Sequence, residues 1–310
     1  MKVSRGLPNP PLPLYPVLTI GNFDGQHLGH RYLLSTVVNR ARERGGTPMV
    51  LTFDPHPVQV LNPNVDFQFL TTPEEKLAWF ESVGVEHLVI LEFTKSFAGL
   101  SPEEFVESIL RDGLGVRELF VGEHFVFGKG RAGNTATLAR LGKQANFQVH
   151  LLKPLGSEDR VVSSTRIRKL IQSGKMEEAQ ECLGRPYSLQ GKVIEGDQRG
   201  QALGCRTANL RLPVGRVIPP DGIYATTMRW KDRLFNSVSY IGTRPTFGQG
   251  ERLLEVHLLD EDGALYGEDI QVYFLKFLRG DEIFESSEAL AARMALDIDL
   301  AREVFRNCSK

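Results

Sequence analysis

The sequence predicts two domains: a doubly wound α/β domain in the first half and an antiparallel six-stranded β-barrel with a closing helix in the second. At 310 residues the chain is long for one domain, since typical domains hold about 100 to 200 residues. Short apolar runs alternate with helical patterns in the first half, whereas strand patterns follow one another directly in the second. We place the boundary between residues 1–186 and 187–310.

Five apolar runs in the first half predict strands, with helices between them. The runs are VLTIGNF (17–23), PMVLTF (48–53), HLVILEF (87–93), ELFVGEHF (118–125) and QVHLL (148–152). Helices are predicted between Leu33 and Ala41, from Pro73, at the capping box of Ser101 and Glu104, near Leu138, and after Ser164 and Lys175. Apolar strands separated by helices indicate a parallel sheet covered on both faces, because parallel strands need a crossover to return.

The second half predicts antiparallel strands joined by short turns. The strand patterns are GKVIEGD (191–197), TANLRL (207–212), GIYATTMRW (222–230), RLFNSVSYIG (233–242), LLEVHLL (253–259) and DIQVYFLKFL (269–278). Lys231-Asp232 and residues 261–263 have the composition of hairpin turns. The segment from Ser286 to Phe305 predicts the closing helix, with an apolar stripe formed by Leu290, Met294, Ile298, Ala301 and Phe305.

The composition predicts a soluble protein without a dominant charge. The 37 basic and 38 acidic side chains nearly balance, which argues against a general binder of nucleic acids or membrane surfaces. The three cysteines form no CxxC or CxxH pair, so we expect neither a disulfide framework nor a zinc site, and a reducing cytoplasm fits best. Prolines interrupt residues 1–16, where we expect a loose leader and no signal peptide.

A glycine- and histidine-rich string, GNFDGQHLGH (21–30), follows the first predicted strand. Parallel sheets bind ligands at the carboxyl ends of their strands, where the next helix offers unpaired N–H groups and a partial positive charge. Gly21, Gly25 and Gly29 allow close backbone approach there. His27 and His30, three residues apart on a first helical turn, can both donate to phosphate oxygens. Two surface histidines beside a glycine-rich turn are the alternative, which would suit an isolated HxxH better than the whole string.

A second phosphate-binding pattern lies at the start of another predicted helix, SSTRIR (163–168). Hydroxyl side chains at a helix start are ordinarily caps, and that interpretation is the better one for the serines and threonine alone. Arg166 and Arg168 in the same turn favour a phosphate-binding site over simple helix caps. Their guanidinium groups suit the negative charge that builds up on a phosphoryl group during transfer.

The two strings together resemble the HxGH and ISSTxIR signatures of nucleotidyltransferases, in which an acceptor attacks the α-phosphorus of a nucleotide and pyrophosphate leaves. The resemblance narrows to the bacterial bifunctional riboflavin kinase/FAD synthetase family and covers nearly the whole chain. Its motifs appear in the family's order as TFDPHP (52–57), Leu70-Thr71, VGEHFVFG (121–128), DGIY (221–224), IGTRPTF (241–247) and LEVHLLD (254–260). The resemblance implies a Rossmann-like nucleotidyltransferase domain that adenylylates FMN, followed by a riboflavin kinase domain.

The same resemblance assigns site residues in the first domain. The implied catalytic residues are His27, His30 and Arg166. The implied ATP contacts are Gly21, Phe23, Asp24, Gly29, Ser163, Ser164, Thr165 and Arg168, and the flavin contacts are Asp54, His124 and Phe125. Two residues depart from the family pattern: His124 stands where Asp or Asn is usual, and Val126 where Arg is frequent. His124 retains hydrogen bonding to a flavin, although not as an acidic partner.

In the second domain a glycine-rich turn from Gly196 to Gly204, which includes Arg199, is an ordinary hairpin if taken alone. By the resemblance it is a flap over ATP. Thr207 and Asn209 match the end of the family's PTAN motif. They are thereby implied to offer neutral oxygen ligands to a phosphate-bound Mg²⁺, which suits a hard ion that keeps several waters.

Glu255 shares one strand face with His257, and a charged residue in that pattern usually marks the solvent side. In the family motif Glu255 instead looks like the general base that deprotonates the terminal ribityl hydroxyl of riboflavin.

Cys205-Arg206 stands where the family has Phe-Pro, so the kinase step could be weakened, leaving an FMN adenylyltransferase whose barrel is a flavin-binding module. A non-catalytic flavin or nucleotide sensor is a third reading. The expected partners are riboflavin, FMN and ATP, with Mg²⁺ and without nucleic acid or membrane; self-association is compatible with the sequence.

Overall fold

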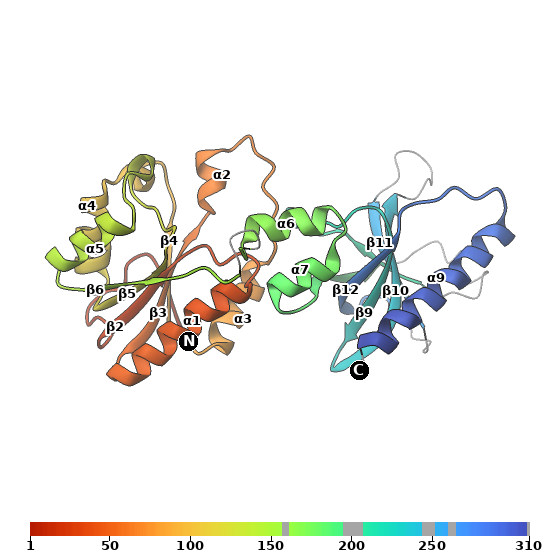
Figure 1. Ribbon diagram of the computed structural model, residues 1–310, viewed down its shortest axis with the longest axis horizontal. Coiled ribbons are helices and arrows are strands. Elements are labelled where there is room, and N and C mark those ends of the chain that lie inside the picture. The colour runs from red at the N-terminus through yellow and green to blue at the C-terminus, as the bar shows by residue number, and fades with distance from the viewer. Residues whose placement is uncertain (157–160, 195–206, 244–251, 260–264, 309–310) are drawn as a thin grey trace. The chain divides into compact units, whose positions relative to one another are not determined.

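The computed structural model describes residues 1–156, 161–194, 207–243, 252–259 and 265–308. The chain forms two compact units, Met1–Ser164 and Thr165–Lys310, and each is described by itself (Figure 1). The short helices α6 (Ser164–Gln172) and α7 (Met176–Leu183) lie in the sequence between the sheet and the barrel. α7 ends at Gly184, whose left-handed backbone agrees with the predicted stop signal.

The first unit contains a six-stranded parallel sheet with the strand order β1-β4-β3-β2-β5-β6. Its strands are β1 (Lys2–Arg5), β2 (Pro16–Ile20), β3 (Thr47–Asp54), β4 (His87–Glu92), β5 (Glu118–Gly122) and β6 (Gln148–Leu152). Every residue of β2 is buried, as expected for a strand covered on both faces. The five predicted strands and their parallel arrangement are confirmed.

Helices cover both faces of this sheet (Figure 1). α1 (Leu28–Arg44) and α3 (Pro73–Ser82) pack on one face. The other face is covered by α4 (Pro102–Glu104), its π-helical continuation (Phe105–Gly113) and α5 (Thr135–Gln144). The connections also hold α2 (Pro57–Leu61) and two short 3₁₀ turns, Phe97–Gly99 and Lys129–Arg131. The doubly wound prediction is therefore confirmed.

The first residues differ from the predicted loose leader. Lys2–Arg5 form the edge strand β1, which pairs in parallel with β4 from His87 to Ile90. The Ser4 hydroxyl also lies 2.9 Å from Nε2 of His87. The leader prediction was wrong for these residues because an edge strand has only one partner strand. It can therefore be short and mostly polar, and it leaves no long apolar run in the sequence.

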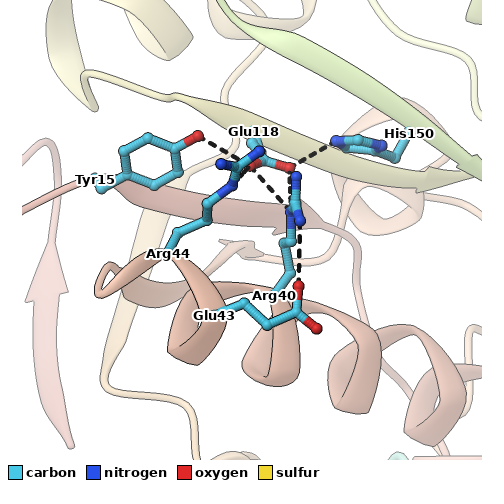
Figure 2. Close-up of polar contacts among 6 residues, drawn as sticks. All are labelled: Tyr15, Arg40, Glu43, Arg44, Glu118 and His150. Atoms are coloured by element: carbon cyan, nitrogen blue, oxygen red, sulfur yellow. Dashed lines mark hydrogen bonds and ion pairs between the residues drawn. The ribbon is translucent and has the colours of Figure 1, made fainter.

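A buried carboxylate ties α1 to the sheet at the amino end of β5. Glu118 is fully buried and accepts hydrogen bonds from the Tyr15 hydroxyl (2.9 Å), Arg40 Nε (2.8 Å) and Arg44 Nε (3.2 Å). His150 Nε2 lies 2.7 Å from the same carboxylate (Figure 2). Burial alone would raise the pKa of Glu118, but hydrogen bonds from Arg40, Tyr15 and His150 outweigh it and hold the pKa below its usual value.

The second unit contains a closed antiparallel barrel with the strand order β10-β11-β8-β7-β12-β9. Its strands are β7 (Tyr187–Ile194), β8 (Thr207–Arg211), β9 (Gly222–Trp230), β10 (Arg233–Thr243), β11 (Arg252–Leu258) and β12 (Asp269–Arg279). Each of these strands overlaps one of the six predicted patterns, and β7 begins at Tyr187, four residues before the predicted GKVIEGD. The predicted six-stranded barrel is confirmed.

The closing helix, α9 (Ser287–Cys308), packs on the outside of the barrel (Figure 1). Ala301 and Phe305 of the predicted stripe are buried with Ala225 of β9. The helix also carries Asp297, which is 2% exposed and binds Arg279 of β12 through Nε (2.9 Å) and Nη2 (2.7 Å). The stripe did not include Asp297 because a charged residue in a helical pattern is usually on the solvent side.

Candidate active sites

The glycine- and histidine-rich string lies at the carboxyl edge of the first sheet. It connects β2 to α1, and β2 pairs with β3 on one side and with β5 on the other. The chain therefore changes direction at β2, which is the position where doubly wound sheets bind ligands. The backbone N–H of Gly21 continues the sheet by donating to the carbonyl of Leu51 (3.1 Å).

His27 and His30 form a stacked pair at the start of α1. His27 is the N-cap, and its Nδ1 accepts a hydrogen bond from the backbone N–H of His30 (3.2 Å). The two ring centroids are 3.5 Å apart with 17° between the planes, and the Phe23 ring lies 5.1 Å from that of His30. A Cβ at Gly29 would come within 3.2 Å of the His27 ring, so glycine leaves room for the stack. Since Nδ1 accepts, neutral His27 carries its proton on Nε2 and can donate it to a phosphate.

Burial keeps both histidines neutral near pH 7. It lowers the pKa of His27 to about 4, against the opposing charge of Asp24. It also lowers the pKa of His30 well below the usual value, and the neighbouring His27 adds to this effect. Nδ1 of His30 is buried and has no hydrogen-bond partner in the part of the chain that the structure describes. Two neutral buried imidazoles can thus gain hydrogen bonds and protons when an anion binds.

Asp24 fixes the loop to the segment that precedes α3. Its carboxylate is buried and accepts hydrogen bonds from the N–H groups of Leu70 (3.0 Å) and Thr71 (3.1 Å). The N–H of Gly25 donates to the Thr71 hydroxyl (3.2 Å). Gly25 has φ +86°, and a Cβ there would come within 2.6 Å of Leu70 Cδ1. These contacts make Asp24 a positioning residue for the histidine pair, and its direct contact with ATP stays a prediction.

The hydroxyl-rich string begins where the first unit ends. The Ser164 hydroxyl donates to the carbonyl of Asp24 (2.7 Å), which bonds the first residue of α6 to the histidine loop. Ser163 directly precedes it. Thr165, Arg166 and Arg168 follow in the first turn of α6, so their predicted role in the same site rests on sequence adjacency.

The three predicted flavin contacts follow the carboxyl ends of β3 and β5, the two neighbours of β2. Asp54 ends β3 and forms an exposed ion pair with Arg5 (3.2 Å). His124 is exposed. Phe125 is half-buried, and its ring lies parallel to Phe127 with centroids 5.8 Å apart. All three lie at the edge that carries the histidine pair, and their contact with a flavin stays a prediction.

Glu255 and the predicted metal ligands lie on neighbouring barrel strands. Asn209 of β8 is the cross-strand partner of Glu255 in β11, and Thr207 is the partner of His257. Such partners have Cβ atoms about 4.5 to 5.5 Å apart. Glu255 and His257 are half-buried while the residue between them is buried, which confirms that they share the outer face. Asn209 is 3% exposed, and its Oδ1 has no hydrogen-bond partner among the described residues.

Tyr240 is a further residue beside Glu255 that the sequence did not reveal. It is the cross-strand partner of Glu255 from β10, and its hydroxyl donates to Asp281 (3.1 Å). Burial, the Asp281 hydrogen bond and three nearby carboxylates raise its pKa, so the phenol stays protonated. A Cβ at Gly242 would collide with the Tyr240 hydroxyl. The only sequence signal for this arrangement is the glycine two residues after the tyrosine, and it is weak.

Several positions named in the sequence analysis lie outside the described residues. They are Gly196, Arg199 and Gly204 of the predicted flap, Cys205 and Arg206, residues 244–247 of the IGTRPTF motif, and the predicted turn at 261–263. In the described ranges no group of three or more His, Cys, Asp or Glu side chains could hold a metal ion. Any Mg²⁺ at Thr207 and Asn209 would therefore rely on neutral oxygens and on the phosphates of ATP. None of the helices that the structure describes is long and apolar enough to span a membrane.

Each half of the chain matches the model of a known protein family. Residues 13–166 match the FAD synthetase family model, and residues 183–305 match the riboflavin kinase model. The bifunctional riboflavin kinase/FMN adenylyltransferase of Escherichia coli (strain K12) is 36% identical over 310 residues, covering 98% of each chain. Its namesake from Bacillus subtilis (strain 168) is 34% identical over 299 residues, covering 95% of this chain and 94% of its own.

A solved structure shares the fold along the whole chain. It is described as a macrolide-efflux protein from Streptococcus pneumoniae, and it matches with a TM-score of 0.87 and 27% identity over 97% of this chain and 99% of its own. The motifs, both family models and the full-length relatives agree, and the chain belongs to the bifunctional riboflavin kinase/FMN adenylyltransferase family.

Proposed function

We propose that the protein phosphorylates riboflavin to FMN with one ATP and then adenylylates FMN to FAD with a second, releasing pyrophosphate. Each half of the chain matches the family model of one reaction, so residues 187–310 are assigned the phosphorylation and residues 1–186 the adenylyl transfer. The observation that carries the second assignment is the stacked histidine pair at the start of α1, in which His27 is buried and His30 half-buried.

In the adenylyl transfer the side chains position two anions and balance their charge. A phosphate oxygen of FMN attacks the α-phosphorus of ATP, and the bond to pyrophosphate breaks without a protein nucleophile. His27 Nε2 donates to a phosphate oxygen. The approaching negative charge raises the pKa of His27 from about 4, so proton uptake stabilises the transition state. Arg166 and Arg168 add fixed positive charge from the first turn of α6.

In the phosphorylation Glu255 takes the proton of the terminal ribityl hydroxyl while its oxygen attacks the γ-phosphorus and ADP leaves. The buried Oδ1 of Asn209, which no described residue hydrogen-bonds, and the Thr207 hydroxyl are oxygen donors of the kind that Mg²⁺ prefers. Bound there, Mg²⁺ would neutralise charge on the ATP phosphates. Because Asn209 is the cross-strand partner of Glu255, one pair of strands would hold both the proposed base and the proposed metal ligands.

The proposal includes a cytoplasmic location and three small-molecule partners, riboflavin, FMN and ATP. The chain has three cysteines without disulfide-forming spacing, and Cys182 is a buried free thiol. Both observations support a reducing compartment. The flap from Gly196 to Gly204, with Arg199, belongs to the proposed kinase ATP site by its sequence alone.

Product assays on one purified protein test both halves. Incubation with riboflavin and Mg-ATP should yield FMN and then FAD, and incubation with FMN should yield FAD directly. His27→Ala should lower FAD formation from FMN by about 100-fold or more and leave FMN formation within about twofold of wild type. Glu255→Gln should do the reverse, because it removes the base of the other site.

Each variant is the control for the other, since the two reactions share one chain. A substitution that spares its own reaction would contradict the site assignment. FAD from FMN without FMN from riboflavin would favour the second candidate, an adenylyltransferase whose barrel only binds flavin. Cys205-Arg206, in place of the family's Phe-Pro, is the observation that favours it. No flavin product from either substrate would contradict the proposed function.

A further inference from the structure

Lys76 lies on the buried side of α3, and no role in the two proposed reactions has been assigned to it. α3 buries Trp79 and Phe80 in one core cluster with Phe23. Lys76 precedes these two residues by three and four positions, so it lies on the same side of the helix. Helical side chains lean toward the amino terminus of their helix, so Lys76 leans toward the first turn of α3.

The first turn of α3 and the segment before it are both bonded to the histidine loop. The carboxylate of Asp24 accepts hydrogen bonds from the N–H groups of Leu70 and Thr71, which precede the N-cap Thr72. The Gln26 side chain donates to the carbonyl of Glu75 (2.8 Å), the residue that precedes Lys76. Lys76 therefore extends from a turn that is docked against the phosphate-binding loop.

Two carboxylates influence the Lys76 ammonium without binding it. Burial lowers the pKa of Lys76, and the charges of Asp24 and Asp54 oppose this shift, which places both carboxylates near the ammonium. Asp24 already accepts hydrogen bonds from the segment before α3, and Asp54 pairs with Arg5. Among the residues that the structure describes, no hydrogen bond or ion pair engages Lys76 Nζ. Lys76 is thus a partly buried cation that no described residue binds.

We propose that Lys76 contacts a phosphate group in the adenylyltransferase site and is a further catalytic residue of FAD formation. Asp24 follows β2, Asp54 ends the neighbouring β3, and the charge of Asp24 also acts on His27. The ammonium and the histidine pair thus lie at the same edge of the sheet. A lysine is a compact charge on a flexible stem, which suits phosphoryl oxygens that move during transfer. This inference rests on the proposed function, in which ATP and FMN both bring phosphate to this edge.

The test uses the full-length protein with Lys76→Met, which keeps the aliphatic stem and removes the charge. Lys143→Met, at an exposed lysine of α5, is the matched control. We expect kcat/KM for FAD formation to fall about 100-fold or more in Lys76→Met. FMN formation from riboflavin by the same protein, and both activities of Lys143→Met, should stay within about twofold of wild type.

The kinetic constants identify which phosphate Lys76 binds. A raised KM for FMN alone assigns the contact to the phosphate of FMN, and a raised KM for ATP alone assigns it to the phosphates of ATP. A lower kcat with both KM values unchanged assigns it to the transition state. Each of these outcomes supports the proposal and identifies which phosphate group Lys76 contacts.

FAD formation by Lys76→Met within about threefold of wild type would overturn the proposal. Normal FAD formation by Lys76→Met at temperatures where its first unit is folded, with a loss only where that unit unfolds, would also overturn the proposal. That result would mark Lys76 as a structural residue. Trp79 fluorescence in a Trp230→Phe background reports this unfolding, since the chain has two tryptophans. If Lys76→Met does not fold, the same assays on Lys76→Gln decide by the same criteria. A wild-type protein that makes no FAD from FMN would contradict the proposed function instead.

Discussion

The stacked histidines have a structural role beside the chemical one that we propose for them. His27 caps α1 and satisfies a backbone N–H that would otherwise lack a partner, and its ring then supports that of His30. The spacing of the two residues predicts that they share a helical turn. Their neutral state depends instead on burial by the rest of the first unit. The start of α1 therefore holds two imidazoles that burial keeps neutral near pH 7.

At this scale the burial of His27 predicts how stability depends on pH. A histidine whose pKa falls on folding binds fewer protons in the folded state than in the unfolded state, between its lowered pKa of about 4 and the ordinary 6.5. The stability of the first unit should therefore fall as the pH is lowered through this window. Between about pH 7.5 and about pH 5 the His27 contribution amounts to about 2 kcal/mol.

His27→Asn is the variant that isolates this contribution, because asparagine is also a good N-cap but does not titrate. Urea denaturation followed by Trp79 fluorescence, in a Trp230→Phe background, measures the free energy of unfolding at both pH values. We expect the pH-dependent loss to be about 2 kcal/mol smaller in His27→Asn than in the parent. Equal losses in the two proteins would show that His27 is not neutralised by folding.

At the scale of the element, α1 is fixed at both ends by residues distant in the sequence. Its start is bonded through the loop at Asp24 to Thr71 and Ser164. Its last two turns are bonded through Arg40 and Arg44 to the fully buried Glu118 (Figure 2). A helix held in this way cannot shift along the sheet, so the histidine pair stays at the carboxyl edge of β2.

Glu118→Gln should lower the free energy of unfolding of the first unit by about 2 kcal/mol, because it breaks a buried ion pair while the partly exposed arginines regain water. Glu43→Gln is the control: Glu43 is an exposed partner of Arg40, and its loss should cost less than about 0.5 kcal/mol. Urea denaturation measures both. Because the pKa of Glu118 is lowered on folding, its stabilisation is present above the usual pKa of 4.5 and is lost as the pH falls below it. Equal effects of the two substitutions would contradict the role given to Glu118.

At the scale of the molecule, the chain forms two compact units, with the histidine pair in the first and the proposed kinase residues Thr207, Asn209 and Glu255 in the second. We therefore expect loss of the barrel's stability to affect FMN formation first. Asp297→Ala leaves the largely buried Arg279 without its main carboxylate and should destabilise the second unit by about 2 to 3 kcal/mol. On heating, FMN formation from riboflavin should be lost at a lower temperature than in wild type, while FAD formation from FMN is unchanged. Asp299→Ala, at an exposed residue of the same helix, should change neither. Loss of both reactions in step would show that the units unfold together.

Much of the fold and of the candidate sites could be predicted because the information is local. Apolar runs, the capping box at Ser101 and the stop at Gly184 each depend on a few neighbouring residues, and the structure contains all of them. The two strings proposed to bind phosphate could be found in the same way, because a strand end, a glycine turn and a helix start are consecutive in the chain. The edge strand β1 could not, since its polar sequence becomes a strand only by pairing with β4.

The sequence by itself determined the two-domain fold, the family and the identity of the chemical groups at both sites. The tertiary structure decided the protonation and the neighbours of these groups. His27 is neutral, Asn209 lies beside Glu255 on the neighbouring strand, and Lys76 lies on the buried side of its helix. The physical reason is that desolvation and strand register arise from contacts between distant residues, such as Asp24 with Leu70. No short window of sequence contains both partners of such a contact, so only the packed molecule fixes the protonation and the position of these side chains.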